Sequence, residues 1–169
     1  MSLPMQIVSN TSPVSNLAII GCLDLLRAKF GQVMIPAAVA VELSRLTHRS
    51  GAAAIDQALT DGWLVTVPVP DRALLPVLRA RVDEGEAEAI EPARQIKARL
   101  LIIDDAAGRR VAHEEGLPYV GIVGLLVEER KAGRISSLKA VLTRLRNESR
   151  FFISPALEAR VLESVGEVP

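Results

Sequence analysis

The chain has 169 residues, of which 49% are apolar, with 20 basic and 20 acidic side chains and one cysteine. This length suits one domain with a substantial core, and the balanced charge gives no support for long-range attraction to nucleic acid or an anionic membrane. A single cysteine excludes an intrachain disulfide; without a long apolar run or a signal-peptide pattern, we expect a cytoplasmic protein with no membrane span.

Five short aliphatic runs recur along the chain, separated by longer segments with helical spacing. The runs are QIVS at 6–9, QVMI at 32–35, WLVTV at 63–67, LLII at 100–103 and YVGI at 119–122. Strands that alternate with helices predict an α/β fold with a mainly parallel sheet. No repeat or linker divides the chain, so we expect one domain over 1–169, with a helical C-terminal extension from about 134.

The first predicted strand ends in SNTSP, residues 9–13. Asparagine, threonine and serine cap helices and form turns, and Pro13 suits the first turn of a helix. Taken alone, the stretch therefore indicates a turn between a strand and a helix. Asn10 is nevertheless a candidate functional residue, because ligands of open α/β sheets bind at the carboxyl ends of the strands.

Two glutamates fall on helix faces where apolar residues are expected. Glu42 lies on the inward stripe of the segment after Pro36, and Glu86 lies on the buried stripe of DEGEAEAIEPA, residues 83–93. Spacing places Glu84, Glu88 and Glu91 on the other faces. A buried carboxylate needs a partner, a proton or a metal ion. The alternative is that each glutamate lies at a helix rim beside an arginine.

The fourth strand is followed by two aspartates, Asp104 and Asp105, in the stretch LLIIDDAAGRR. One aspartate is sufficient to cap the helix that follows. The second is not explained by capping, and we expect at least one of the two to be functional. Asp104 is nearer the strand and better directed toward the crevice. In the helix before this strand, we expect Pro92 to produce a kink or a break.

Together these stretches resemble a PIN domain, the nuclease fold of VapC-type toxins and many RNA-processing enzymes. They also resemble a PIN-like subfamily of predicted nucleic-acid-binding proteins. The matching stretches are IVSNTSPVSNLAIIGCLDLL at 7–26, VMIPAAVAVEL at 33–43, DEGEAEAIEPA at 83–93, LLIIDDAAGRRVAHEEGLPYVGIVGLL at 100–126 and, more weakly, FFISPALEARVLESVGE at 151–167. The resemblance implies a three-layer α/β fold and cleavage of single-stranded RNA with Mg²⁺ or Mn²⁺.

Carried over by position, the resemblance implies that Glu42, Glu86 and Asp104 bind the ion, with Asp105 as a neighbouring or substitute ligand. Three carboxylates are sufficient to hold one Mg²⁺. Asn10 occupies the family's first acidic position. Its amide offers a neutral oxygen, or a hydrogen bond to a water on the ion, but it brings no charge and cannot act as a general base.

The resemblance also implies roles for three neighbouring side chains. Thr11 and Ser12 match the small hydroxyl residues that follow the family's first acid, and we expect one of them to orient substrate or water. Arg109 is a candidate for contact with a substrate phosphate. The alternative for Arg109 is an ion pair with Glu86 or Glu114.

The resemblance further implies a homodimer and a small antitoxin protein that covers the acidic pocket. Asn10 favours a second interpretation, a non-catalytic PIN-like module that binds nucleic acid or a protein. Aromatic residues make up only 3% of the chain, so we do not expect an RNA reader built on base stacking, and we expect Trp63 to be packed. His48 and His113 lack partners at ligand spacing, so we do not expect zinc.

Overall fold

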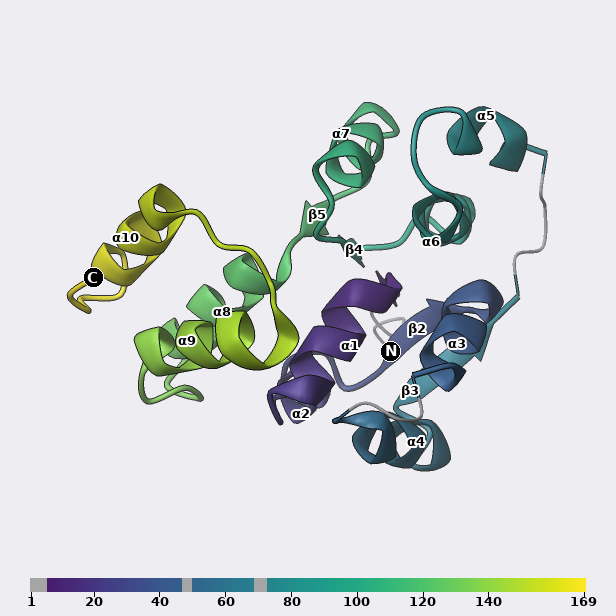
Figure 1. Ribbon diagram of the computed structural model, residues 1–169. Coiled ribbons are helices and arrows are strands. Elements are labelled where there is room, and N and C mark those ends of the chain that lie inside the picture. The colour runs from purple at the N-terminus through teal and green to yellow at the C-terminus, as the bar shows by residue number, and fades with distance from the viewer. Residues whose placement is uncertain (1–5, 47–49, 69–72) are drawn as a thin grey trace, which may run out of the picture.

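The computed structural model describes residues 6–46, 50–68 and 73–169, which form five strands and ten helices (Figure 1). The strands are β1 (Ile7–Ser9), β2 (Val33–Pro36), β3 (Leu64–Val67), β4 (Leu100–Ile102) and β5 (Tyr119–Val120). The helices are α1 (Thr11–Ile19), α2 (Asp24–Phe30), α3 (Ala37–Ser44), α4 (Ala52–Thr60), α5 (Leu75–Arg79), α6 (Glu84–Gln95), α7 (Ala106–Glu114), α8 (Ile122–Lys131), α9 (Leu138–Ser149) and α10 (Pro155–Glu163). No helix in the described ranges has the length and apolar character needed to cross a bilayer.

The five predicted strands are confirmed, and they form one parallel sheet in the order β3-β2-β1-β4-β5. The chain first extends the sheet from β1 through β2 to β3, and then returns to the other side of β1 with β4 and β5. β1 and β4 therefore lie side by side where the direction of sheet growth reverses. In open parallel sheets, this reversal opens a crevice at the carboxyl ends of the two strands.

Two apolar cores lie on opposite faces of the sheet, because neighbouring strand residues point to opposite sides. Ile7 and Ile102 pack with helices that include α1, α2, α8 and α9. Val8 and Leu101 pack on the other face with α5, α6 and α7. Figure 1 shows these two groups of helices on either side of the strands. The structure is thus the three-layer α/β fold that the resemblance implied.

The helix α6 is not broken at Pro92, which lies inside it. It differs from the sequence expectation in which of its faces are buried. Glu88 and Glu91 were expected on outer faces but are buried, at 3% and 0% exposure. Helical spacing predicts one buried face, whereas α6 contacts α3, α5, α7 and the sheet. The two carboxylates are accommodated by ion pairs with arginines of α5 and α6.

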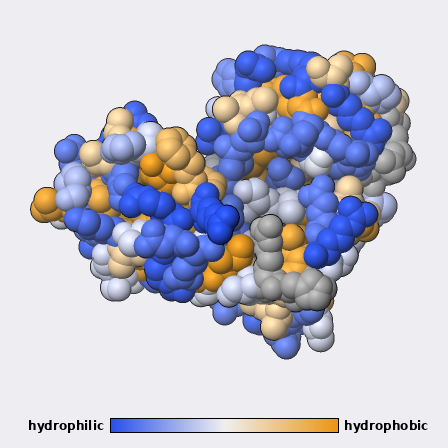
Figure 2. All heavy atoms as spheres, viewed as in Figure 1, coloured by the Kyte–Doolittle hydropathy of each residue, from blue (hydrophilic) through white to orange (hydrophobic). Residues whose placement is uncertain are grey.

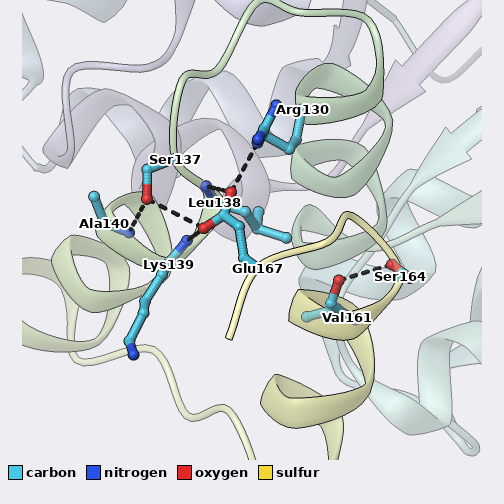
Figure 3. A network of polar contacts seen from close by, with 8 residues as sticks. All are labelled: Arg130, Ser137, Leu138, Lys139, Ala140, Val161, Ser164 and Glu167. Atoms are coloured by element: carbon cyan, nitrogen blue, oxygen red, sulfur yellow. Dashed lines mark hydrogen bonds and ion pairs between the residues drawn. The ribbon is translucent and has the colours of Figure 1, made fainter. Parts of the chain in front are cut away.

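The last residues fold back on the start of α9 through one carboxylate, as Figure 3 shows. Glu167 Oε1 accepts hydrogen bonds from Arg130 Nε and Leu138 N, both at 2.7 Å. Its Oε2 accepts from Lys139 N at 2.9 Å and Ser137 Oγ at 3.2 Å. Free N–H groups at a helix start favour a negative charge. The Arg130 bond and these backbone bonds lower the pKa of Glu167 to about 2.

We predict that Glu167→Gln lowers the free energy of unfolding by roughly 1–2 kcal/mol at pH 7, because the amide provides one acceptor in place of two charged oxygens. The ordinary pKa is 4.5 and the folded value is lower, so this stabilisation is present above pH 4.5 and is lost as the pH falls toward 2. Urea unfolding at pH 7 and pH 3 measures it. Glu163→Gln, at an exposed position of α10, is the matched control, and an equal loss in both variants would contradict the prediction.

Candidate active site

A hollow of about 950 Å³ lies at the carboxyl ends of β1 and β4 and contains all the predicted site residues. It is bordered by the starts of α1, α6 and α7, by α3, and by the segment between α9 and α10. The predicted residues that line it are Asn10, Thr11, Ser12, Glu42, Glu86, Asp104, Asp105 and Arg109. Segments far apart in the sequence thus meet at the crevice of the sheet.

Asn10 joins the two central strands but does not cap the helix that it precedes. Its backbone N–H donates to the carbonyl of Ile102 at 3.0 Å. The side chain makes no capping bond to α1, and within the described structure its buried Oδ1 has no hydrogen-bond partner. Buried acceptors are nearly always bonded, so an open one requires an explanation. Because this oxygen belongs to a residue of the acidic hollow, it is suited to a cation or a water.

Glu42 reaches the start of α1 from helix α3. Its Oε2 accepts a hydrogen bond from the Thr11 hydroxyl, and its carboxylate is partly exposed in the hollow. A Cβ placed on Gly85 would lie 3.0 Å from Glu42 Oε1. The absence of a side chain at Gly85 therefore allows the start of α6 to approach Glu42. Glu42 borders the core, as its place on the apolar stripe predicted.

Glu86 and Asp105 form a pair of carboxyl groups joined by a hydrogen bond. Burial, the charges of Asp83 and Asp105, and this bond raise the pKa of Glu86 to about 7. Burial acts against ionisation of Asp105 too, but its bonds from the first amides of α7, at 2.7 and 3.1 Å, lower its pKa. A proton on Glu86 is thus donated to ionised Asp105. The side chain of Asp83 and that of Glu86 also form a reciprocal capping box at the start of α6.

Asp104 is directed away from the α7 cap and toward α1 and α8. Its Oδ1 accepts from Ile122 N, the first amide of α8, at 2.7 Å, and its Oδ2 is 3.5 Å from the Ser12 hydroxyl. Burial raises the pKa of Asp104 despite these bonds and the nearby charge of Arg109. The sequence did not show which of the two aspartates caps the helix. Asp105 caps α7, and Asp104 does not.

Several residues differ from the sequence expectations or were missed by them. Arg109 lies beside Asp104, and Glu114 pairs with Arg81 instead. His113 is exposed, and His48 lies outside the described residues. Phe151 and Phe152 also line the hollow. The sequence placed them in a weakly matching C-terminal stretch and gave no signal that this stretch returns to the site.

The donor chemistry fits a hard divalent cation, although the ligands are not assembled around one position. The hollow offers carboxylate oxygens from Glu42, Glu86 and Asp104 together with the open Oδ1 of Asn10, and oxygen is the ligand that Mg²⁺ and Mn²⁺ prefer. In the described part of the chain, no three acidic, histidine or cysteine side chains form a group that could hold an ion. The residues therefore fit the ion by chemistry, and they line one hollow without surrounding a single position.

We predict that Glu86→Gln stabilises the protein at pH 8 in the presence of a chelator by on the order of 2 kcal/mol. Folding raises the pKa of Glu86 from 4.5 to about 7. Ionised Glu86 therefore destabilises the folded state; this loss of stability is absent below pH 4.5, grows between pH 4.5 and 7 and stays constant above pH 7. Urea unfolding at pH 4.5 and pH 8 measures the difference. The exposed control Glu115→Gln should show no such pH dependence, and equal stabilities of wild type and Glu86→Gln at pH 8 would refute the prediction.

The comparison with known families covers both the sheet and the acidic hollow. A family model described as DUF3368: PIN domain matches residues 6–167, which include all five strands and every residue that lines the hollow. Among curated proteins, none matches the chain. PIN domains have a nuclease-type fold and generally depend on divalent metal ions. Since the match spans nearly the whole sequence, the chain belongs to the PIN-domain family.

Proposed function

We propose that the chain is a metal-dependent endoribonuclease of the VapC toxin type, which hydrolyses phosphodiester bonds of single-stranded RNA. The observation that carries this proposal is the gathering of Asn10, Glu42, Glu86 and Asp104 in one hollow at the reversal of a parallel sheet. Family membership supports the same reaction class. A small antitoxin protein that covers the hollow, a homodimer and a cytoplasmic location belong to the same proposal.

The charge of the hollow supports a requirement for a cation. Acidic side chains dominate its polar lining, and Arg109 is its only basic residue among those described. A phosphate entering this hollow is repelled unless a cation balances the carboxylates. Burial raises the pKa of Glu86, and the charges of Asp83 and Asp105 raise it further because they disfavour another negative charge.

In this proposal Glu42, Glu86 and Asp104 hold the ion, with Asp105 as a neighbouring ligand. A bound Mg²⁺ or Mn²⁺ supplies Lewis-acid chemistry for phosphodiester hydrolysis. Glu86 releases its proton when it binds the ion, and Asn10 offers a neutral oxygen through Oδ1.

Three further side chains orient these groups and the substrate. Thr11 holds the carboxylate of Glu42 through its hydroxyl. Ser12, which accepts a hydrogen bond from Asn16 Nδ2 at 3.0 Å, faces Asp104 and orients substrate or water. Arg109 contacts a substrate phosphate from the rim of the hollow.

Asn10 favours a second candidate, a non-catalytic PIN-like module that binds nucleic acid or a protein partner. An amide cannot accept a proton as a general base and adds no charge to the ion site. Under this alternative, the carboxylates retain their hydrogen bonds to the starts of α6, α7 and α8 as structural contacts. The two candidates differ in whether the wild-type protein cleaves RNA.

We predict that Glu42→Gln and Asp104→Asn each weaken Mn²⁺ binding by roughly 10-fold or more in calorimetry at pH 7.5, because each removes a charged oxygen ligand. Asparagine at 104 retains an acceptor for the first amide of α8, which preserves that helix cap. Glu115→Gln, an exposed change outside the hollow, should bind Mn²⁺ like wild type. Equal Mn²⁺ affinity in all four proteins would exclude the metal site.

We predict that wild type cleaves a single-stranded RNA pool in Mn²⁺, and that Asn10→Asp raises the cleavage rate by on the order of 10-fold, because it restores a charged acceptor at the end of β1. Gel analysis of end-labelled RNA measures both rates. Asn16→Asp, which adds the same charge at another position of the hollow, controls for charge alone. Cleavage by Asn10→Asp but not by wild type would favour the non-catalytic candidate.

A further inference from the structure

A second hollow adjoins the acidic one on the side of α8 and α10, and most of the aromatic residues gather there. The chain contains three phenylalanines, one tyrosine and one tryptophan. Tyr119, Phe151 and Phe152 line this second hollow, whereas Trp63 is buried in the core as expected. The two hollows share Asp104, Arg109, Phe151 and Phe152 in their linings, so they adjoin each other at these residues. Figure 2 shows an indentation of the surface between the C-terminal helices and the part formed by α5 to α7.

Phe152 is exposed because its neighbours are fixed. Phe151 packs against the core, and Ile153 is buried at 5% exposure, so the ring of Phe152 between them is directed outward. The Ser154 hydroxyl caps the start of α10 and fixes the chain on that side. Phe152 is 83% exposed, the highest value among the large apolar side chains described. The ring is thus presented to solvent by an anchored backbone.

An exposed aromatic ring beside a charged hollow has the chemistry of a base-stacking contact. Every nucleobase has a π face, so stacking on an aromatic side chain tolerates any sequence but requires an unpaired base. Arg109 lines both hollows and places a positive charge between them, where the sugar-phosphate chain would pass from base to acidic site. The scarcity of aromatics in the sequence argued against stacking, but their count says nothing about where they lie.

We propose that Phe152, which shares the second hollow with Tyr119 and Phe151, stacks an unpaired base of the nucleic acid whose phosphate enters the acidic hollow. This inference rests on the proposed function, since it takes single-stranded RNA as the ligand of the same site. Duplex RNA keeps its bases stacked inside the helix, so the platform selects single strands. The second hollow adjoins the acidic one and shares Arg109 with it, which favours RNA over a protein segment as the occupant.

The test compares variants at Phe152 for binding of a fluorescein-labelled single-stranded oligoribonucleotide, measured by anisotropy. Ca²⁺ replaces Mn²⁺ as an ion that takes oxygen ligands, and a gel verifies that the RNA stays intact. Phe152→Ala and Phe152→Leu should each weaken binding about 10-fold, whereas Phe152→Tyr should stay within about two-fold of wild type. Affinity for duplex RNA should not change. Val77→Ala, at an exposed apolar position outside both hollows, is the control.

Three results would overturn the inference. The first is equal affinity of Phe152→Leu and wild type for single-stranded RNA, because the contact would then be apolar burial and not stacking. The second is the absence of measurable binding of the single strand by wild type. A loss of self-association in Phe152→Ala during sedimentation, with RNA affinity unchanged, would assign the ring to a contact between copies of the chain.

Cleavage of the same RNA in Mn²⁺ separates this inference from the proposed function. Binding that depends on the ring at Phe152 without any cleavage by wild type supports the stacking platform and contradicts the nuclease. Cleavage by wild type with equal RNA affinity in wild type, Phe152→Ala and Phe152→Leu supports the nuclease and overturns the platform.

Discussion

Parallel pairing of β1 with β4 is the constraint on which the site depends. Ser9 pairs with Ile102, and the Asn10 N–H donates to the Ile102 carbonyl at 3.0 Å. This register places the residues after both strands at the same edge of the sheet. A shift by one residue would turn the side chains that follow to the opposite faces. The strands are only three residues long, so the two apolar cores that enclose them must fix the register.

Helix starts compensate for the concentration of acidic groups at this edge. The hollow borders the starts of α1, α6 and α7, and Asp104 accepts the first amide of α8. Helix starts carry partial positive charge and unpaired N–H groups, which stabilise nearby carboxylates. Asp105 has a lowered pKa for this reason. Glu86 is less well compensated, because burial and the charges of Asp83 and Asp105 oppose its ionisation, and its bond to the Asp83 amide is long, at 3.4 Å.

The sequence predicted features that depend on local pattern. Spacing and residue type predicted the strands and the position of Glu86 on a buried stripe. They also predicted that one aspartate of the pair Asp104 and Asp105 caps a helix. The burial of Glu88 and Glu91 could not be predicted in this way. It depends on packing of α3 and α5 against α6, whereas spacing predicts only one buried face for this helix.

Features of the site that depend on long-range contacts could not be predicted from local sequence patterns either. The unpartnered Oδ1 of Asn10 depends on how β1, β4 and α1 meet, whereas residue type alone predicted a cap. Phe152 reaches the site because the chain folds back after α9, which no short stretch encodes. Residue type therefore identified the acidic groups, and tertiary packing decided which oxygens are open and which rings adjoin them.

Asn10 affects the charge balance of the hollow as well as its ligand set. At neutral pH the hollow already keeps a proton on part of Glu86, whose pKa is about 7. An aspartate at position 10 would add a further negative charge beside groups that resist ionisation, whereas the amide offers an oxygen without that repulsion. Under the proposed function, a cation and the Glu86 proton compete for the same carboxyl group. Metal affinity must then rise with pH through about 7, because each bound ion displaces the proton that Glu86 otherwise retains.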